Sequence, residues 1–151
     1  MIKWVFVMVL LSSELFASQF FPYRSKLDSA WKNEAYNDRF IKSLESKGLK
    51  KEQGYLAVAY MMKSNHASMP WTKLKYFNKG KNLLEQTIKE NPNVVEWIFY
   101  RHEIQRRIPK ALNYNNLKED LGTLRNYVAA KENKHEDESL YSYILKLLKC
   151  S

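Results

Sequence analysis

The sequence predicts an all-α protein, a bundle of about six helices packed as antiparallel pairs. Only four glycines and four prolines occur among 151 residues, which is too few for the turns of a β-sandwich or barrel. Apolar residues recur at helical spacing, and no alternating apolar pattern of strand length follows the first residues. With 45% hydrophobic residues the chain can fill one core. We therefore expect a single all-helical domain over residues 18–151.

Residues 1–17 are predicted to be a cleavable signal peptide. Lys3 precedes an apolar run from Trp4 to Leu11, and the small residue Ala17 suits a cleavage point. The run is too short to span a bilayer, and it lacks the polar face of the alternative, an N-terminal helix of the fold itself. The leader carries one basic and one acidic residue, so its removal leaves the net charge at +9. We expect an exported protein, periplasmic or secreted, and export disfavours nucleic acid as a partner.

Helices are predicted from the start of the mature chain. Residues from about Ser25 to Lys47 favour helix, with Asp38 as a candidate N-cap and Gly48 as a natural end. The apolar face of this helix holds Phe40, Ile41 and Leu44. The next segment, Gly54–Met62, is apolar or small all round, which predicts a helix at the centre of the bundle.

The stretch Ser64–Thr72 is the least helical part of the sequence and predicts a nine-residue loop. Pro70 suits the first turn of the following helix. Phe77, Leu84 and Ile88 form the apolar stripe of that helix, which ends at Asn91-Pro92.

Two further helices begin with a similar pattern, an Asn followed three residues later by a Glu. Asn93 with Glu96 and Asn116 with Glu119 resemble capping boxes, and Pro109 closes the first of these helices. A polar break over residues 131–138 precedes the last helix. The apolar stripe of that helix contains Leu140, Ile144, Leu147 and Leu148.

The segment Gly54–Pro92 resembles a tetratricopeptide-type helix pair. The second helix of that motif carries a small, a bulky apolar, a small and a proline residue at steps of four, three and five, and here these are Gly80, Leu84, Thr87 and Pro92. Small residues let two helices approach, and the proline turns the chain into the next pair. The resemblance implies an antiparallel helix-pair fold that holds a peptide or protein partner on a concave face.

A longer run, residues 74–120, is similar to a set of small, exported, uncharacterised bacterial helical proteins. Their shared pattern is a helix ending in Pro, a second helix with an embedded Arg and Gln, a Pro-Leu-Tyr turn and an acidic start to the next helix. This resemblance implies the fold and the compartment, and it brings no activity.

Arg101 and Gln105 are polar residues on an apolar helix face. On a helical wheel of residues 94–108 both fall within the arc of the apolar side chains. A buried guanidinium must be paired, and its candidate partners are Glu85, Glu119 and Asp120. One interpretation is a structural tie between three helices, and the other is a polar socket for the carboxylate or phosphate of a ligand.

Five lysines and no acidic residue lie between Lys63 and Lys81, with aromatic residues among them. Such a pattern can bind nucleic acid, anionic lipid head groups or acidic polysaccharide. The alternative is a solvated helix face. The candidate contacts are the lysines Lys73, Lys75 and Lys79 and the aromatic residues Trp71 and Tyr76.

No catalytic, metal or cofactor site is expected. The three histidines lie in separate segments without the spacing of a metal pair, and a single cysteine, Cys150, excludes an intramolecular disulfide and a thiolate zinc site. No nucleophile in a known motif accompanies His102 and Glu103. A small hydrolase built on these two residues would need a pocket that joins them to a nucleophile.

The expected function is therefore an exported, non-catalytic interaction domain that binds a peptide or protein. Its contacts would be Arg101 and Gln105 as polar anchors with Trp71 and Tyr76, on a concave helix face or at the Ser64–Thr72 loop. The alternative is an envelope-surface or acidic-polymer binding protein that acts through the lysines. Steep loss of affinity with salt would indicate the second.

Overall fold

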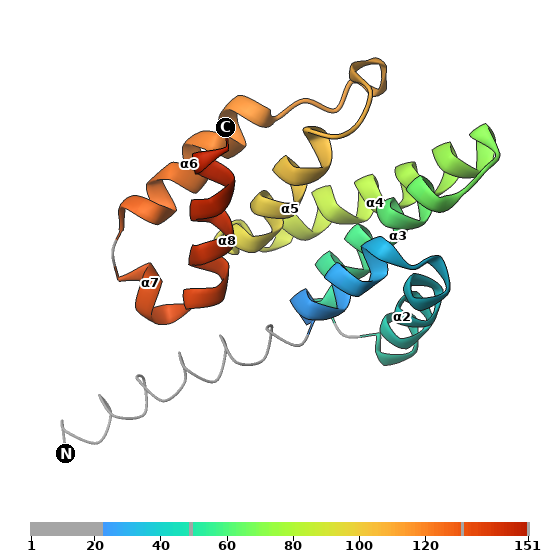
Figure 1. Cartoon of the computed structure of the whole chain (residues 1–151), viewed down its shortest axis with the longest axis horizontal. Helices are drawn as coiled ribbons and strands as arrows, with labels where there is room; N and C mark the ends of the chain where they lie inside the picture. The colour runs from blue at the N-terminus through green and yellow to red at the C-terminus, as the bar shows by residue number, and fades with distance from the viewer. Residues whose placement is uncertain (1–22, 49, 131, 151) are drawn as a thin grey trace.

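The computed structural model describes residues 23–48, 50–130 and 132–150, and all regular structure in these ranges is helical (Figure 1). The all-α prediction is thereby confirmed, whereas the predicted signal peptide lies outside the described residues. A helical segment over residues 23–32 comes first. It is followed by α2 (Glu34–Lys47), α3 (Gln53–His66), α4 (Pro70–Glu90), α5 (Val95–Gln105), α6 (Leu117–Ala129), α7 (Asn133–Glu136) and α8 (Glu138–Lys149), with 3-10 turns at Lys50–Glu52 and Lys110–Leu112.

The N-terminal part of the fold is two helices, because the chain breaks at Asn33. The Asn33 side chain accepts a hydrogen bond of 2.9 Å from the backbone N–H of Tyr36 and caps α2. The predicted cap, Asp38, is wrong: it lies inside α2, where its carboxylate is 2.7 Å from Nζ of Lys63. The predicted end at Gly48 is confirmed, since this glycine adopts the left-handed conformation with φ 59°.

Helices α3 and α4 form the most closely packed pair. A Cβ atom on Gly80 would lie 2.6 Å from the carbonyl oxygen of Ala57 and 2.6 Å from Cγ of Met61, so the absent side chain lets the two helices touch. The predicted nine-residue loop Ser64–Thr72 is wrong, because α3 continues to His66 and α4 begins at Pro70. Packing against α4 extends α3 through residues with weak helix propensity. The expected place of Pro70 in the first turn is confirmed.

Helices α5 and α6 begin close to the predicted positions, but neither has the predicted capping box. Helix α5 starts at Val95 without a side-chain cap, and Glu96 is buried in an ion pair. Asn116 stands at the N-cap of α6 without capping it, because its side chain binds Gln105. The carboxylate of Glu96 and the carboxamide of Asn116 each bind a side chain from another element, and these bonds replace the predicted local caps.

The C-terminal part contains one more helix than predicted, the single turn α7 within the polar break. Asp137 caps the next helix, α8, by accepting a 3.0 Å hydrogen bond from the backbone N–H of Leu140. The apolar stripe of α8 is buried as expected at Leu140, Ile144 and Leu147. With α7 and the break at Asn33, the described residues form eight helical segments where about six were expected.

Helix α5 lies between two apolar cores. The larger core fills the space between residues 23–32, α2, α3 and α4, and it includes Trp97 of α5. The smaller core lies between α5, α6 and α8, and it includes Phe99. The N-terminal and C-terminal helices therefore flank α5 on opposite sides (Figure 1). Among the described residues, no helix is both long and apolar enough to cross a membrane.

Candidate functional site

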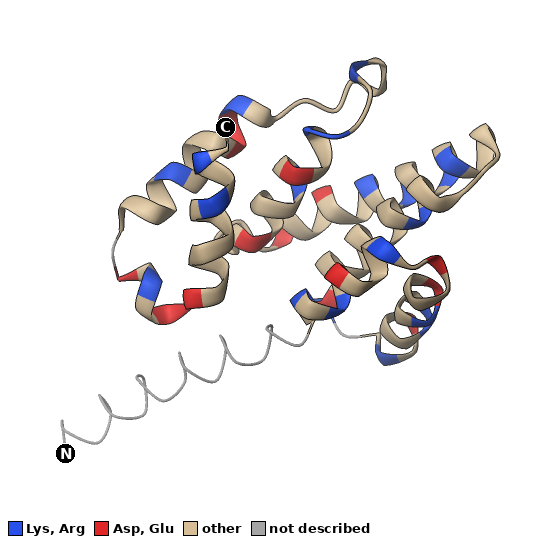
Figure 2. Ribbon diagram, in the orientation of Figure 1, with Lys and Arg blue, Asp and Glu red and all other residues tan. Residues whose placement is uncertain are grey.

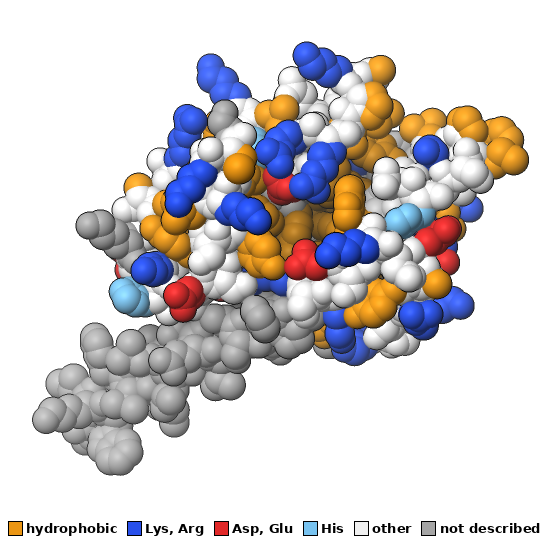
Figure 3. All heavy atoms as spheres, in the orientation of Figure 1, with side chains coloured by type: hydrophobic (Ala, Val, Ile, Leu, Met, Phe, Trp, Pro, Cys, Tyr) orange, Lys and Arg blue, Asp and Glu red, His pale blue; other side chains and the backbone are white. Residues whose placement is uncertain are grey.

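A groove of about 950 Å³ opens between residues 23–32, α3, the start of α4, α5 and α8. Apolar side chains gather in this hollow in the space-filling view, with lysines and arginines around its edge (Figure 3). Its volume is within the range of ligand-binding sites. The apolar lining includes Leu27, Val58, Met61, Met62, Phe77, Phe99 and Ile104.

The rim of the groove carries more positive than negative charge. Apart from the buried Arg24, its cations are Lys32, Lys73, Arg106, Arg107 and Lys146, and its carboxylates are Asp28 and Glu103. Glu103 is shared, because Nη2 of Arg106 lies 3.0 Å from one of its oxygens and Nη2 of Arg107 lies 2.6 Å from the other. One carboxylate thus faces two guanidinium groups, and the rim favours anionic ligands.

Apolar side chains are exposed where the groove meets solvent. Trp31, Leu74 and Tyr143 line it and are all exposed. The guanidinium carbon of Arg107 lies 5.2 Å from the ring centroid of Trp31, so a cation–π contact joins the N-terminal helix to the segment after α5. Exposed apolar surface around a hollow is typical of a binding site.

A buried ion-pair cluster around Arg24 lies beneath the groove. The guanidinium binds Glu96 through two hydrogen bonds of 2.8 and 2.9 Å and Asp137 through two of 2.8 and 2.5 Å. Tyr55 donates a further hydrogen bond of 2.6 Å to Glu96. Burial alone would lower the pKa of Arg24, but the two carboxylates outweigh it and raise that pKa above its ordinary value. The cluster joins residues 23–32, α3, α5 and the start of α8.

Arg101 is paired in the way expected of a charge on an apolar face. Its guanidinium binds Asp120 with distances of 2.5 to 3.2 Å and Glu85 at 3.0 Å, so two of the three candidate partners are confirmed. Burial opposes the charge, but the hydrogen bonds that Arg101 donates to Asp120 raise the pKa of Arg101. The hydroxyl of Tyr114 donates to the other oxygen of Glu85 at 2.5 Å. These bonds join α4, α5 and α6.

Both polar atoms of the Gln105 carboxamide form hydrogen bonds with Asn116. Nε2 donates to Oδ1 of Asn116 at 3.1 Å, and Oε1 accepts from the backbone N–H of Asn116 at 2.6 Å. The two residues stand at the end of α5 and the start of α6, so this pair fixes the base of the connection that carries Arg106 and Arg107.

Tyr76, Lys75 and Lys79 lie outside the groove lining, on a second face formed by α2, α3 and α4. The rings of Tyr76 and Tyr60 stack with centroids 6.3 Å apart. Nζ of Lys79 lies 3.9 Å from the centroid of Tyr60, and Nζ of Lys75 lies 5.9 Å from that of Tyr76. The Glu45 carboxylate, 3.8 Å from Nζ of Lys79, offsets part of the positive charge on this face, and the aromatic rings hold the ammonium groups through cation–π contacts.

The remaining two candidates lie near the connection between α3 and α4. Lys73 lines the groove, whereas Trp71 lies outside it and is 69% exposed. The seven predicted contact residues thus fall into separate places: Arg101 and Gln105 between helices, Lys75, Lys79 and Tyr76 on the second face, Lys73 at the groove and Trp71 beside it.

His102 and Glu103 point to different surroundings. Glu103 lines the groove, whereas His102 is buried and is not part of that lining. Burial lowers the pKa of His102, although the charges of Asp120 and Glu103 oppose this. Within the described ranges, no group of three or more His, Cys, Asp or Glu residues is placed to hold a metal ion.

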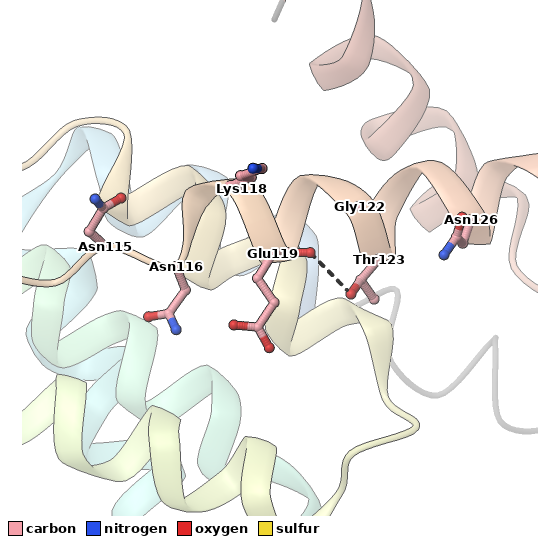
Figure 4. A pocket seen from close by; sticks show the side chains of 7 residues that line it. All are labelled: Asn115, Asn116, Lys118, Glu119, Gly122, Thr123 and Asn126. Atoms are coloured by element: carbon pink, nitrogen blue, oxygen red, sulfur yellow. Dashed lines mark hydrogen bonds between the residues drawn. The ribbon is translucent and has the colours of Figure 1, made fainter.

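A shallow polar hollow runs along α6 (Figure 4). Its side chains are carboxamides, a hydroxyl and charged groups, and the hydroxyl of Thr123 donates to the backbone carbonyl of Glu119 at 3.3 Å. Since all of its lining residues except the half-buried Asn116 are exposed, the hollow offers a ligand no enclosed contact.

Sequence analysis missed Arg24, Trp31 and Arg107. Arg24 and Glu96 stand 72 positions apart, and Glu96 resembled a local cap. An Arg directly before a predicted helix that carries Leu27 and Ala30 was the only signal that could have indicated a buried pair. No family model matches the chain, and neither a curated protein nor a solved structure is significantly similar to it, so its function is inferred from the groove itself.

Proposed function

We propose that this protein is an exported, non-catalytic helical interaction domain of tetratricopeptide-like pairing, and that its groove binds an acidic amphipathic peptide segment of a protein partner. One observation carries the proposal: an apolar groove of about 950 Å³ is rimmed by five cations and two carboxylates. The apolar floor favours a peptide with bulky apolar side chains, and the cationic rim favours acidic residues between those side chains.

The floor suits side chains of more than one shape. Met61 and Met62 lie side by side in it, and methionine fills irregular space because its side chain is unbranched and flexible. Phe77 and Phe99 add rigid aromatic surface. We expect leucine, isoleucine or phenylalanine of the partner to supply the buried anchors.

The rim suits carboxylates at the edges of the peptide. Lys32 and Lys73 flank the groove on the side of the N-terminal helix and α4, and Lys146 does so on α8. Arg107 offers a fork of donors for a carboxylate. Because the floor supplies most of the affinity, added salt should weaken binding only moderately.

Arg101 and Gln105 support the proposal as positioning residues. Their hydrogen bonds to Asp120 and Asn116 hold α6 against α5. The connection between these helices carries groove residues from Arg106 to Pro109, together with Ala111 and Leu112. Loosening either bond would therefore move the wall without removing a contact to the peptide.

Fluorescence polarisation with short labelled peptides tests the proposal. One peptide alternates leucine and phenylalanine with glutamate at helical spacing, a second has lysine in place of glutamate, and a third has serine in place of the apolar residues. We expect the first to bind at least about tenfold more tightly than the other two. The third peptide has the same charge as the first, so it separates the contribution of the apolar anchors from the electrostatic attraction to the rim.

Two variants with the same charge change locate the binding. Arg107→Glu reverses a rim charge, and Lys89→Glu reverses an exposed charge on α4 outside the groove lining. Arg107→Glu should lower the affinity for the acidic peptide at least about tenfold, and Lys89→Glu should change this affinity less than about twofold. Trp31→Glu should also weaken it, since this side chain is exposed on the groove wall.

Three outcomes would overturn the proposal. Equal binding of the acidic and lysine peptides would show that the rim plays no part. Equal effects of Arg107→Glu and Lys89→Glu would show that net charge alone attracts the peptide. Tight binding of a free fatty acid such as oleate, with no binding of any peptide, would show that the groove is a lipid pocket.

A further inference from the structure

We infer that the tip of the α3–α4 hairpin is a docking site for a bilayer that contains anionic phospholipid. The hairpin tip comprises residues 66–75, which are the end of α3, the connection and the first turns of α4. The tip shares Pro70, Lys73 and Leu74 with the groove lining, whereas Met69, Trp71 and Lys75 lie outside it. The inference rests on exposed apolar surface, local charge and the position of the tip.

The tip exposes large apolar side chains to solvent. Trp71 is 69% exposed, Met69 51% and Leu74 49%, which makes these the three most exposed large hydrophobic residues of the described ranges. Pro70 between them is exposed as well. A folded protein rarely gathers such side chains on one protrusion unless they meet an apolar partner.

Over residues 53–84 of the hairpin the charge has a single sign. Residues 53–84 contain no aspartate or glutamate but five lysines, and Figure 2 shows no acidic residue along the outer half of the hairpin. Lys63 is paired with Asp38 from α2 at 2.7 Å. Lys73 and Lys75 of the tip are exposed, and no carboxylate of the described residues lies within ion-pair distance of either.

The position of the tip leaves it free to meet a flat surface. The hairpin projects away from α6, α7 and α8 and ends beyond the other helices (Figure 1), and apolar atoms gather at its extremity (Figure 3). A flat bilayer can therefore contact Met69, Pro70 and Trp71 without meeting the body of the protein first.

The chemistry of the tip matches the interfacial region of a membrane. Tryptophan favours the head-group level because its ring is apolar and its N–H is polar. Met69 and Leu74 can enter the acyl boundary beside it, while the ammonium groups of Lys73 and Lys75 bind lipid phosphates. An acidic polysaccharide would use the lysines but would give Met69 and Leu74 no apolar partner.

Trp71 fluorescence provides a direct test on the full chain. In a background of Trp4→Phe and Trp31→Phe, Trp71 and the buried Trp97 are the only tryptophans left of four. Adding vesicles of phosphatidylglycerol and phosphatidylcholine should shift the emission to the blue. Brominated lipid should quench it, and Trp71→Phe should abolish both effects.

Charge variants test the role of the lysines. Lys73→Glu with Lys75→Glu should weaken vesicle binding at least about tenfold more than Lys89→Glu with Lys118→Glu, which makes the same change of net charge on exposed residues elsewhere. Circular dichroism confirms that each variant folds. Trp71→Ser should weaken vesicle binding and leave the acidic peptide bound in the groove.

Three results would overturn the inference. Unquenched Trp71 with anionic vesicles would show that the tip does not insert, and equal weakening by the two double variants would show that only net charge matters. Salt-sensitive binding to heparin without any change of Trp71 emission on vesicles would identify the face as a polyanion site.

Discussion

Nε of Arg24 lies 2.8 Å from Oε1 of Glu96, and the two residues are 72 positions apart in the sequence. Both are almost fully buried, with exposed fractions of 3% and 2%. Nη2 of Arg24 also donates to Glu96, and Nη1 and Nη2 donate to Asp137, which caps α8. One guanidinium therefore pairs with two carboxylates and joins the first described helix to α5 and the C-terminal helix.

Replacing Arg24 should destabilise the protein more than replacing either carboxylate. In Arg24→Met the buried Glu96 loses its counter-charge and faces Asp137 without compensation, which should cost about 3 to 5 kcal/mol in the free energy of unfolding. Glu96→Gln should cost less, because Arg24 keeps Asp137 and the new carboxamide still accepts from Tyr55. Urea denaturation measures each loss.

The double variant Arg24→Met, Glu96→Leu controls for lost packing. It leaves no unpaired charge in the fully buried part of the cluster, so it should be less destabilised than the sum of the single changes. Fully additive losses would show that the two residues do not stabilise one another.

Arg101→Leu should lower the melting temperature by roughly 10 °C. The reason is that Asp120, with an exposed fraction of 0%, would remain buried without its partner. Glu85→Gln is the matched control: its carboxylate is 38% exposed, so losing this charge should cost less than about 1 kcal/mol. An intact or raised melting temperature for Arg101→Leu would contradict a structural tie and favour a role in ligand binding.

The helices were predicted well where their signals lie close together in the sequence. The stripe that includes Leu84 and Ile88 identified α4, Pro70 marked its start, and Gly48 marked the end of α2. These features depend on residues within a few turns of one another, so one sequence is sufficient to find them.

The caps failed where a side chain had a better partner elsewhere. Asp38 and Glu96 both suit a helix N-terminus, but they bind Lys63 and Arg24 instead. Local propensity favours a cap by about 1 kcal/mol, and the buried pair of Glu96 with Arg24 outweighs this. The pair of Asp38 with Lys63 is partly exposed, and Asp38 does not cap α2 because Asn33 caps it five residues earlier. No spacing in the sequence reveals which distant cation lies nearby.

The candidate site was predictable only in part. The ion pairs of Arg101 could be predicted from the sequence, because a charge on an apolar face needs an acidic partner and only a few acidic residues stand on the neighbouring helices. The groove could not be predicted, because it forms where residues 23–32, α3, α5 and α8 meet. Trp31 and Arg107, which are in contact at the groove, are 76 residues apart in the sequence (107 − 31).

Gly80→Ala should destabilise the α3–α4 pair, although alanine is the better helix former. The new Cβ would lie 2.6 Å from the backbone oxygen of Ala57, which cannot move without shifting α3. Overpacking of this kind costs about 1 to 3 kcal/mol and exceeds the gain in propensity of about 1 kcal/mol. Thermal unfolding measures the net effect.

Gly122→Ala is the matched control in α6, since nothing lies within 4 Å of its added Cβ. It should stabilise the protein by about 0.5 to 1 kcal/mol through helix propensity alone. If both variants gained stability, the close approach of α3 and α4 at Gly80 would be contradicted.

His102 should make the protein less stable as the pH falls below neutrality. Burial lowers its pKa in the folded state below the ordinary 6.5, so near pH 6 the unfolded chain binds more protons than the folded one. The free energy of unfolding should therefore be constant above about pH 7 and fall below it, by at most about 1.4 kcal/mol per pH unit.

Urea denaturation between about pH 5.5 and 7.5 isolates this contribution. Burial raises the pKa of Asp120 above 3.8, and that group acts with the opposite sign at lower pH, because there the folded state binds the extra proton. His102→Gln should flatten the profile, whereas the exposed His135→Gln should leave it as in the parent chain. A slope that survives His102→Gln would assign the acid sensitivity to another group.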